Sequence, residues 1–164
     1  MSTNANAGRI NLSLYEILDP ELLNEGIRLR LIRLICYLRF ATSEGWSRVE
    51  RAIVDTGAPV AMIPWSIWNR IAVRPLSTRV MEIHGISAND QEQSFVPARL
   101  AEVTCVLLDQ TCVSPPLSLR AYLMPDDATP LVLGFEDLLT SYELLCNYVR
   151  NETFLRLPLS QSPD

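Results

Sequence analysis

The stretch that decides the fold of this chain is Ala52-Ile53-Val54-Asp55-Thr56-Gly57-Ala58-Pro59-Val60-Ala61-Met62-Ile63-Pro64. Ile53 and Val54 are typical of the end of a β-strand, and Gly57 permits a sharp turn with close backbone approach. This order predicts a carboxylate at the floor of a cleft, beside a hydroxyl and backbone N–H groups. Asp and Gly are also ordinary turn residues after a strand, so the tripeptide alone fits a plain turn equally well.

The surrounding sequence favours a site over a plain turn. Residues 61–63 are apolar and predict a second strand after the turn, and Pro64 is suited to the start of a short helix. A similar run of strand, glycine and helix lies far downstream, at Pro130-Leu131-Val132-Leu133-Gly134-Phe135-Glu136-Asp137-Leu138-Leu139. Together the two runs are much more specific than the tripeptide.

In their order and separation, these two runs resemble the active-site turn and the supporting glycine element of the retropepsin family of aspartic proteases. The resemblance covers roughly residues 34–157 and implies a mostly β, single-domain acid-protease β-barrel with one or two short helices. It divides the chain into an extension (1–33), partly disordered with a possible short helix, a protease domain (34–158) and a disordered tail (159–164).

The resemblance also implies roles for individual residues. Asp55 would be the catalytic carboxylate, Thr56 would hydrogen-bond across a dimer, and Gly57 would let the substrate backbone approach. Gly134 would pack beneath the turn, where a side chain would collide. No second Asp-Thr-Gly or Asp-Ser-Gly occurs in the chain, so the second carboxylate of such an enzyme would come from another copy in a two-fold homodimer.

A mobile hairpin that closes over the substrate is a further feature of this family. Residues 80–84 and 92–100 predict two strands around the turn Gly85–Asp90, in the place where retropepsins carry this flap. The resemblance assigns substrate contact to the residues Ala58, Gly85, Ile86 and Ser87. His84, the lone histidine, fits an exposed or half-buried strand position better than a catalytic one.

The sequence departs from the family after the downstream glycine. Many retropepsins have arginine there, followed by Asp or Asn, and the arginine helps to tie the dimer. Phe135 and Glu136 occupy these positions, and an apolar residue cannot make that ion pair.

Composition excludes several other classes of protein. The 164 residues fit one domain, and the net charge of −5 argues against a nucleic-acid partner. No apolar run is long enough to span a membrane, and residues 1–8 lack the apolar core of a signal peptide, so we expect a cytoplasmic protein. Four cysteines without Cys-x-x-Cys spacing predict free buried thiols, with no metal site and no cofactor.

The segment between the extension and the active-site turn allows two structures. Residues 27–40 have apolar residues at helical spacing with arginines between them, which is typical of a helix lying on a membrane surface. Residues 27–31 alternate equally well as a strand, and the resemblance favours strands, with 34–41 pairing with 48–54. Before it, residues 1–12 predict a disordered lead, and Asp19 is a suitable N-cap for a short helix ending near Gly26.

Two functions are therefore weighed. The first is an aspartic endopeptidase that hydrolyses polypeptide with a water molecule activated between two Asp55 carboxylates. The second is a non-catalytic module that keeps the fold for peptide binding or dimerisation, which the glycine-poor flap and Phe135 would favour. Retention of the ionisable Asp55 favours the protease.

Overall fold

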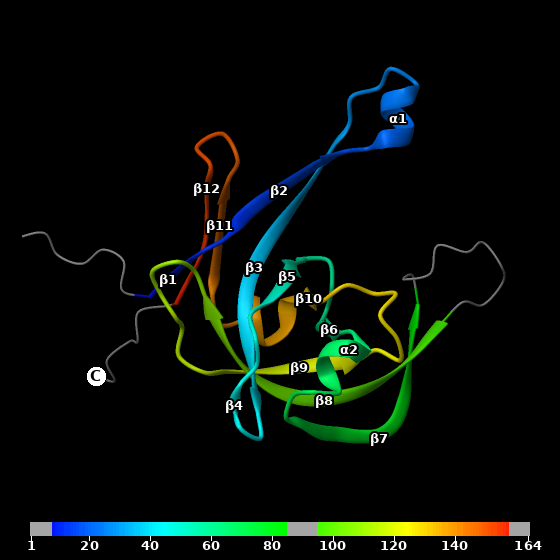
Figure 1. The fold of residues 1–164 in the computed structure, drawn as a ribbon, viewed down its shortest axis with the longest axis vertical. Helices are drawn as coiled ribbons and strands as arrows, with labels where there is room; N and C mark the ends of the chain where they lie inside the picture. The colour runs from blue at the N-terminus through cyan, green and yellow to red at the C-terminus, as the bar shows by residue number, and fades with distance from the viewer. Residues whose placement is uncertain (1–7, 85–94, 158–164) are drawn as a thin grey trace, which may run out of the picture.

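Two β-sheets form most of the computed structural model, which describes residues 8–84 and 95–157 (Figure 1). The predicted mostly β, single-domain architecture is confirmed. The smaller sheet has the order β1 (Arg9–Asn11), β12 (Glu152–Arg156), β11 (Glu143–Asn147). The larger sheet has the order β2 (Ser13–Leu18), β3 (Arg30–Thr42), β5 (Glu50–Val54), β10 (Val132–Leu133), β6 (Ala61–Ile63), β9 (Leu117–Leu123), β8 (Phe95–Leu108), β7 (Val73–His84).

The path of the larger sheet returns on itself. β8 pairs with β9 and β7, and its end also pairs with β3, from Tyr37 opposite Leu108 to Phe40 opposite Cys105. The short β4 (Gly45–Trp46) pairs with the end of β3 and forms the predicted turn toward β5. β8 is one continuous strand of 14 residues, longer than the strand predicted over residues 92–100.

β10 lies between the two strands that flank the Asp55 turn. It runs parallel to β5, with Val132 opposite Ile53 and Leu133 opposite Val54, and antiparallel to β6. Both of its residues are buried, as expected for a strand covered on both faces. The two sequence runs that carried the fold prediction are thus neighbours in space.

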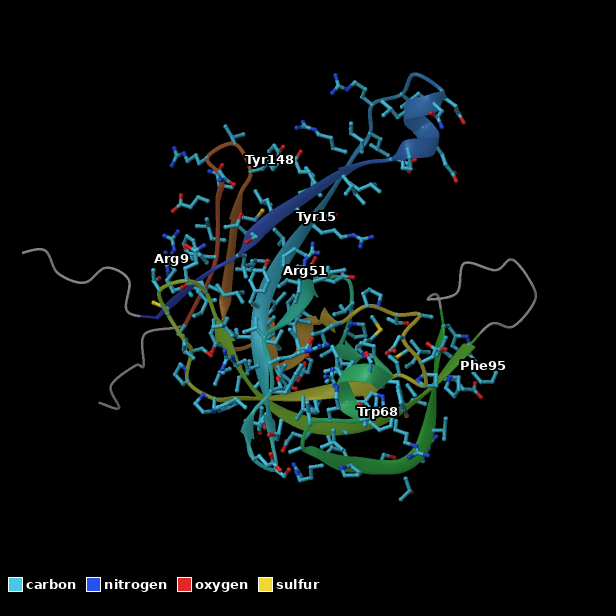
Figure 2. The ribbon with its side chains drawn as sticks, in the orientation of Figure 1. Arg9, Tyr15, Arg51, Trp68, Phe95 and Tyr148 are labelled. Carbon is cyan, nitrogen blue, oxygen red and sulfur yellow. The ribbon has the colours of Figure 1, made fainter. Side chains whose placement is uncertain are left out.

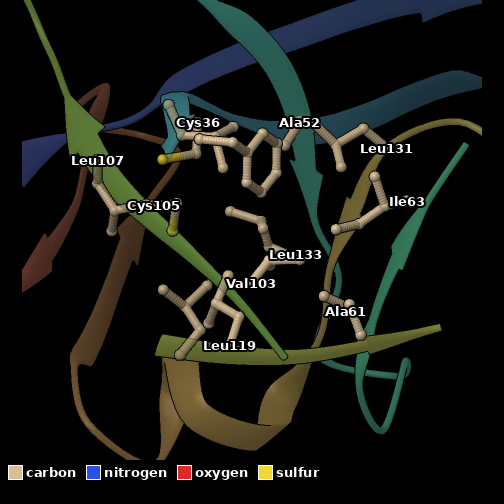
Figure 3. Close-up of a cluster of buried hydrophobic side chains, with 14 of the residues drawn as sticks. Cys36, Ala52, Ala61, Ile63, Val103, Cys105, Leu107, Leu119, Leu131 and Leu133 are labelled. Carbon is tan, nitrogen blue, oxygen red and sulfur yellow. The ribbon is translucent and has the colours of Figure 1, made fainter. Parts of the chain in front are cut away.

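The core lies inside the ring of strands (Figure 3). Alternation along β3 shows how the sequence builds it: Cys36, Leu38 and Phe40 are buried, whereas the intervening Tyr37 and Arg39 are exposed. Several other strands contribute fully buried side chains, among them Ala52, Ile63, Val103, Cys105, Leu107, Leu119 and Leu133.

Three short helical segments complete the fold, where one or two were predicted. α1 (Pro20–Asn24) begins after Asp19, whose carboxylate accepts hydrogen bonds from two backbone N–H groups, which confirms the predicted cap. α2 (Trp65–Trp68) begins after Pro64, as the sequence predicted. η1 (Phe135–Leu139) is an irregular turn with non-helical backbone at Glu136 and Asp137. Within the described residues, no helix is long and apolar enough to cross a membrane.

The N-terminal region differs from the sequence expectation. Residues 9–11, expected in a disordered lead, form β1 and pair with β12, and residues 13–18 form β2 and pair with β3. The basic amphipathic helix considered for residues 27–40 is also wrong, because β3 occupies most of this segment. β2, α1 and the first part of β3 form a two-stranded arm that rises away from the two sheets, with α1 at its far end (Figure 1).

The cysteines divide into two classes, and the prediction that all four are buried is wrong. Cys36 and Cys105 are buried free thiols, whereas Cys112 is partly exposed and Cys146 is exposed. Burial raises the pKa of both Cys36 and Cys105 to about 12.

We therefore expect a maleimide reagent near neutral pH to label two thiols in the native protein and all four in denaturant, as counted by mass spectrometry. Rapid native labelling of Cys36 would contradict this placement.

A carboxylate fastens β1 to the loop after β8. Asp109 accepts hydrogen bonds from the backbone N–H and side-chain amide of Asn11 at 2.8 and 2.7 Å, and from the backbone N–H groups of Thr111 and Cys112, both at 2.7 Å. Partial burial alone would raise the pKa of Asp109, but these N–H donors and the Thr111 hydroxyl outweigh it and lower the pKa to about 2.

This lowered pKa predicts a pH-dependent contribution to stability. Because the folded pKa lies below the unfolded value of about 3.9, the contribution is complete above that value and is lost as the pH falls toward 2. We expect Asp109→Asn to lower the free energy of unfolding by about 1–2 kcal/mol near neutral pH, and by less near pH 2. Urea unfolding at several pH values measures both. The same difference in free energy of unfolding between the wild type and Asp109→Asn at every pH would contradict the prediction.

Candidate active site

Asp55 follows β5 directly and lies in an exposed turn. Its carboxylate oxygen Oδ1 accepts a hydrogen bond from the backbone N–H of Gly57 at 2.8 Å, and its backbone carbonyl accepts one from the N–H of Ala58 at 3.3 Å. Asp55, Thr56 and Gly57 are exposed, whereas Ala58 is buried. The local hydrogen bonds therefore orient the carboxylate while one of its oxygens stays open to solvent.

The downstream glycine holds this turn from beneath. A Cβ atom added to Gly134 would lie 2.4 Å from the backbone carbon and oxygen of Val60 and 2.8 Å from the carbonyl oxygen of Ala58. Such separations are too short for any side chain, so only glycine allows this approach. The placement agrees with the role expected for Gly134.

Backbone hydrogen bonds lock the two elements together. The N–H of Asp55 donates to the carbonyl of Leu133 at 3.0 Å, and the N–H groups of Phe135 and Glu136 donate to the carbonyls of Ala58 and Pro59 at 2.8 and 2.9 Å. The turn is thus bound at both ends to β10 and the residues after it. Its geometry depends on a segment distant in sequence.

An arginine from another strand secures that segment. Arg120, on β9, forms a two-pronged ion pair with Asp137, with Nε 3.0 Å from Oδ2 and Nη2 2.8 Å from Oδ1, and also bonds to Glu136. The hydrogen bonds that Arg120 donates lower the pKa of Asp137, and the same bonds to the Asp137 carboxylate raise the pKa of Arg120. The chain lacks arginine after Gly134, but a guanidinium from β9 pairs with the acidic residues that follow.

A cavity of about 420 Å³ opens beside the Asp55 carboxylate. Its lining comes from three sources: the turn, β6 with β9, and the end of β7. The lining residues are Asp55, Gly57, Ala58, Pro59, Val60, Met62, Glu82, Ile83, His84 and Tyr122. A mostly apolar cavity with one oriented carboxylate at its edge is a common form of binding site.

The cavity brings together some of the residues predicted from sequence. Asp55, Gly57 and Ala58 line it, Thr56 lies in the same turn, and Gly134 lies beneath. The predicted flap residues Gly85, Ile86 and Ser87 lie outside the described residues. The strands that lead to them, β7 and β8, pair from Val80 opposite Arg99 to His84 opposite Phe95, as the flap prediction requires.

Two polar residues of the cavity were missed by sequence reasoning. Glu82 and His84 lie on β7, and both line the cavity with Asp55, whereas His84 was expected to be a strand histidine without a role. Ile83 lies between them and also lines the cavity, so the end of β7 as a whole meets the cavity. Nothing in the sequence indicated that this strand end would reach the Asp55 turn.

The ionisable side chains that line the cavity are those of Asp55, Glu82, His84 and Tyr122. Within residues 8–84 and 95–157, no group of three or more His, Cys, Asp or Glu side chains is placed to hold a metal ion. Neither a protein-family model nor a curated protein matches this chain.

Proposed function

We propose that the chain is an aspartic endopeptidase with the retropepsin-like β-barrel, active as a two-fold homodimer. The observation that carries the proposal is the locked turn: a carboxylate oriented by its own Gly57 N–H and fixed from beneath by Gly134, at the edge of a cavity of about 420 Å³. The pairing of β3 with β8, which returns the larger sheet on itself, supports a barrel.

The mechanism needs two carboxylates. On the two-fold axis, Asp55 from each copy would lie about 3 Å from the other, where both cannot be ionised, so the pair shares one proton. The ionised carboxylate takes a proton from a water molecule, whose oxygen attacks the scissile carbonyl carbon. The protonated carboxylate donates to the carbonyl oxygen, and transfer of a proton to the amide nitrogen lets the peptide bond break.

The exposed surface of the turn supports a second copy. Asp55 and Thr56 are exposed in the single chain, and the Thr56 side chain has no hydrogen-bond partner within the described part of the chain. A two-fold axis beside the turn would bury both residues and give the Thr56 hydroxyl a partner in the other copy.

The proposal is tested by incubating purified protein with a peptide library from acidic to neutral pH and analysing the products by mass spectrometry. We expect cleavage that an inhibitor mimicking the tetrahedral intermediate abolishes, and that weakens toward neutral pH as the pair loses its shared proton. Intact peptides at every pH, from a protein shown to be dimeric, would overturn the protease. Peptides bound without cleavage would favour the non-catalytic binding module.

A further inference from the structure

The arm formed by β2, α1 and the first residues of β3 has almost no core of its own. Between residues 13 and 33 no side chain is buried, although the segment is rich in apolar residues. Eight of its large apolar side chains are exposed: Tyr15, Ile17, Leu18, Leu23, Ile27, Leu29, Leu31 and Ile32. A two-stranded ribbon is at best marginally stable in water, and apolar clusters of this kind mark interaction surfaces.

One face of the arm is partly occupied within the chain. Face A of the arm is defined here by Leu14, Glu16 and Leu18 with the residues opposite them on β3. Further along the arm, the Tyr148 hydroxyl donates to Glu16 and accepts from Arg30, which ties the arm to the β11–β12 turn. The opposite face contacts β5 near the sheet, through Tyr15.

Face B of the arm, defined by Tyr15 and Ile17 with Arg33 and Leu31 opposite them, continues the surface that carries Asp55. In the same sheet, the β5 residues Ala52 and Val54 point into the core. Arg51 and Ile53 therefore point the other way, and Asp55 comes next in this alternation. Face B and the active-site turn therefore belong to one surface.

The root of face B has a hollow with a basic rim. The Arg51 guanidinium lies 4.4 Å from the centre of the Tyr15 ring, which joins the arm to β5 (Figure 2). A hollow of about 190 Å³ lies here, lined by Tyr15, Arg33, Ile35, Arg51, Ile53, Pro130 and Leu131. Among the described residues, neither Arg33 nor Arg51 forms an ion pair.

The far end of the arm is acidic on balance, with three carboxylates against the single guanidinium of Arg28. Asp19, Glu21 and Glu25 surround α1, next to the exposed apolar Leu23 and Ile27, and no ion pair involves these carboxylates within the described residues. Two arms that cross antiparallel about a two-fold axis would bring the acidic apolar tip of each to the basic hollow of the other. The charges are thus complementary between two copies of the same surface, as a two-fold interface requires.

We propose that face B of the arm binds a second copy of this chain, with the acidic tip of each arm against the Arg33–Arg51 hollow of the other. The inference rests on the proposed homodimer and extends its interface beyond the active-site turn. Face B, the acidic tip and the hollow would form one side of this interface together with the active-site turn. Burial of Ile17 and Leu31 supplies the apolar contact, and the charges set the antiparallel direction.

The first test removes the apolar contact. In full-length protein, Ile17→Ser combined with Leu31→Ser is compared with the control Leu76→Ser combined with Val113→Ser, which changes exposed apolar residues outside the arm. Sedimentation equilibrium is expected to show a dimer dissociation constant at least about tenfold higher for the arm variant, and near the wild-type value for the control. Circular dichroism checks that both variants are folded.

The second test reverses the charges. Reversal of the tip (Glu21→Arg with Glu25→Arg) or of the root (Arg33→Glu with Arg51→Glu) is expected to weaken the dimer, and both reversals together to restore it. This recovery distinguishes a direct contact from a damaged fold. Three results would each overturn the inference. They are a wild-type dissociation constant in the arm serine variant, no recovery of the dimer in the combined charge reversal, and a wild-type chain that is monomeric.

These results are independent of peptide cleavage. Cleavage by a dimer that the arm variants leave unchanged would overturn the arm inference and retain the protease. A dimer that the arm variants weaken, but that cleaves nothing, would support the arm and overturn the protease.

Discussion

Replacement of Asp55 by asparagine is expected to lower peptide cleavage by at least about 10³-fold, because one substitution removes both carboxylates of a homodimeric site. An amide can neither take the proton from the attacking water nor share one with its neighbour. The amide oxygen still accepts the hydrogen bond that Gly57 donates to Asp55 at 2.8 Å. We therefore expect the free energy of unfolding to change by less than about 1 kcal/mol.

Initial rates on a fluorogenic peptide selected from the library measure the effect. Asp126→Asn is a matched control, because Asp126 lies in an exposed turn and its carboxylate accepts a hydrogen bond from the N–H of Ala128, which asparagine can also accept. The control should retain wild-type rates. Cleavage by Asp55→Asn at more than about a tenth of the wild-type rate would refute the carboxylate mechanism.

Replacement of Gly134 by alanine is expected to give the largest loss of stability among the substitutions considered, about 3–5 kcal/mol. The new methyl group would lie 2.4 Å from the backbone of Val60, and neither backbone can withdraw without breaking the hydrogen bonds between Phe135 and Ala58 and between Glu136 and Pro59. Activity should fall with stability, because the same hydrogen bonds fix the Asp55 turn.

Urea unfolding of this variant is best compared with that of Gly26→Ala. Gly26 has nothing within 4 Å of an added Cβ, but its φ of +81° is unfavourable for alanine, so this control isolates backbone strain of about 1–2 kcal/mol. If Gly134→Ala lowers the free energy of unfolding no more than Gly26→Ala does, then the tight packing of Gly134 does not stabilise the Asp55 turn.

The sequence contained the elements of the site that are local. The run from Ile53 to Gly57 predicted a strand followed by a turn that presents Asp55, and the structure has β5 followed by that turn. Asp19 was predicted to cap a short helix, and it caps α1. In both cases the signal lies within a few residues of sequence. The place of Gly134 beneath the turn was expected instead from the resemblance, and the structure has Gly134 there.

The parts that could not be predicted depend on contacts between distant segments. Residues 27–40 have apolar residues at helical spacing, and residues 27–31 alternate equally well as a strand. Pairing with β2, β5 and β8 makes most of this segment a strand. Arg120 gave no sign that it would pair with Asp137, and His84 none that its strand would meet the Asp55 cavity. β1 has only three residues, too few for a periodic pattern, and forms because β12 lies beside it.

The position of β10 between β5 and β6 also bears on how the protein matures. During synthesis, the Asp55 turn leaves the ribosome long before Gly134, yet its backbone groups find their partners only when β10 inserts between the two earlier strands. Contacts of such long sequence separation form late and slowly. A growing chain would therefore carry the Asp55 carboxylate in an unfinished turn, and the proposed active site would assemble only after β10 has been synthesised.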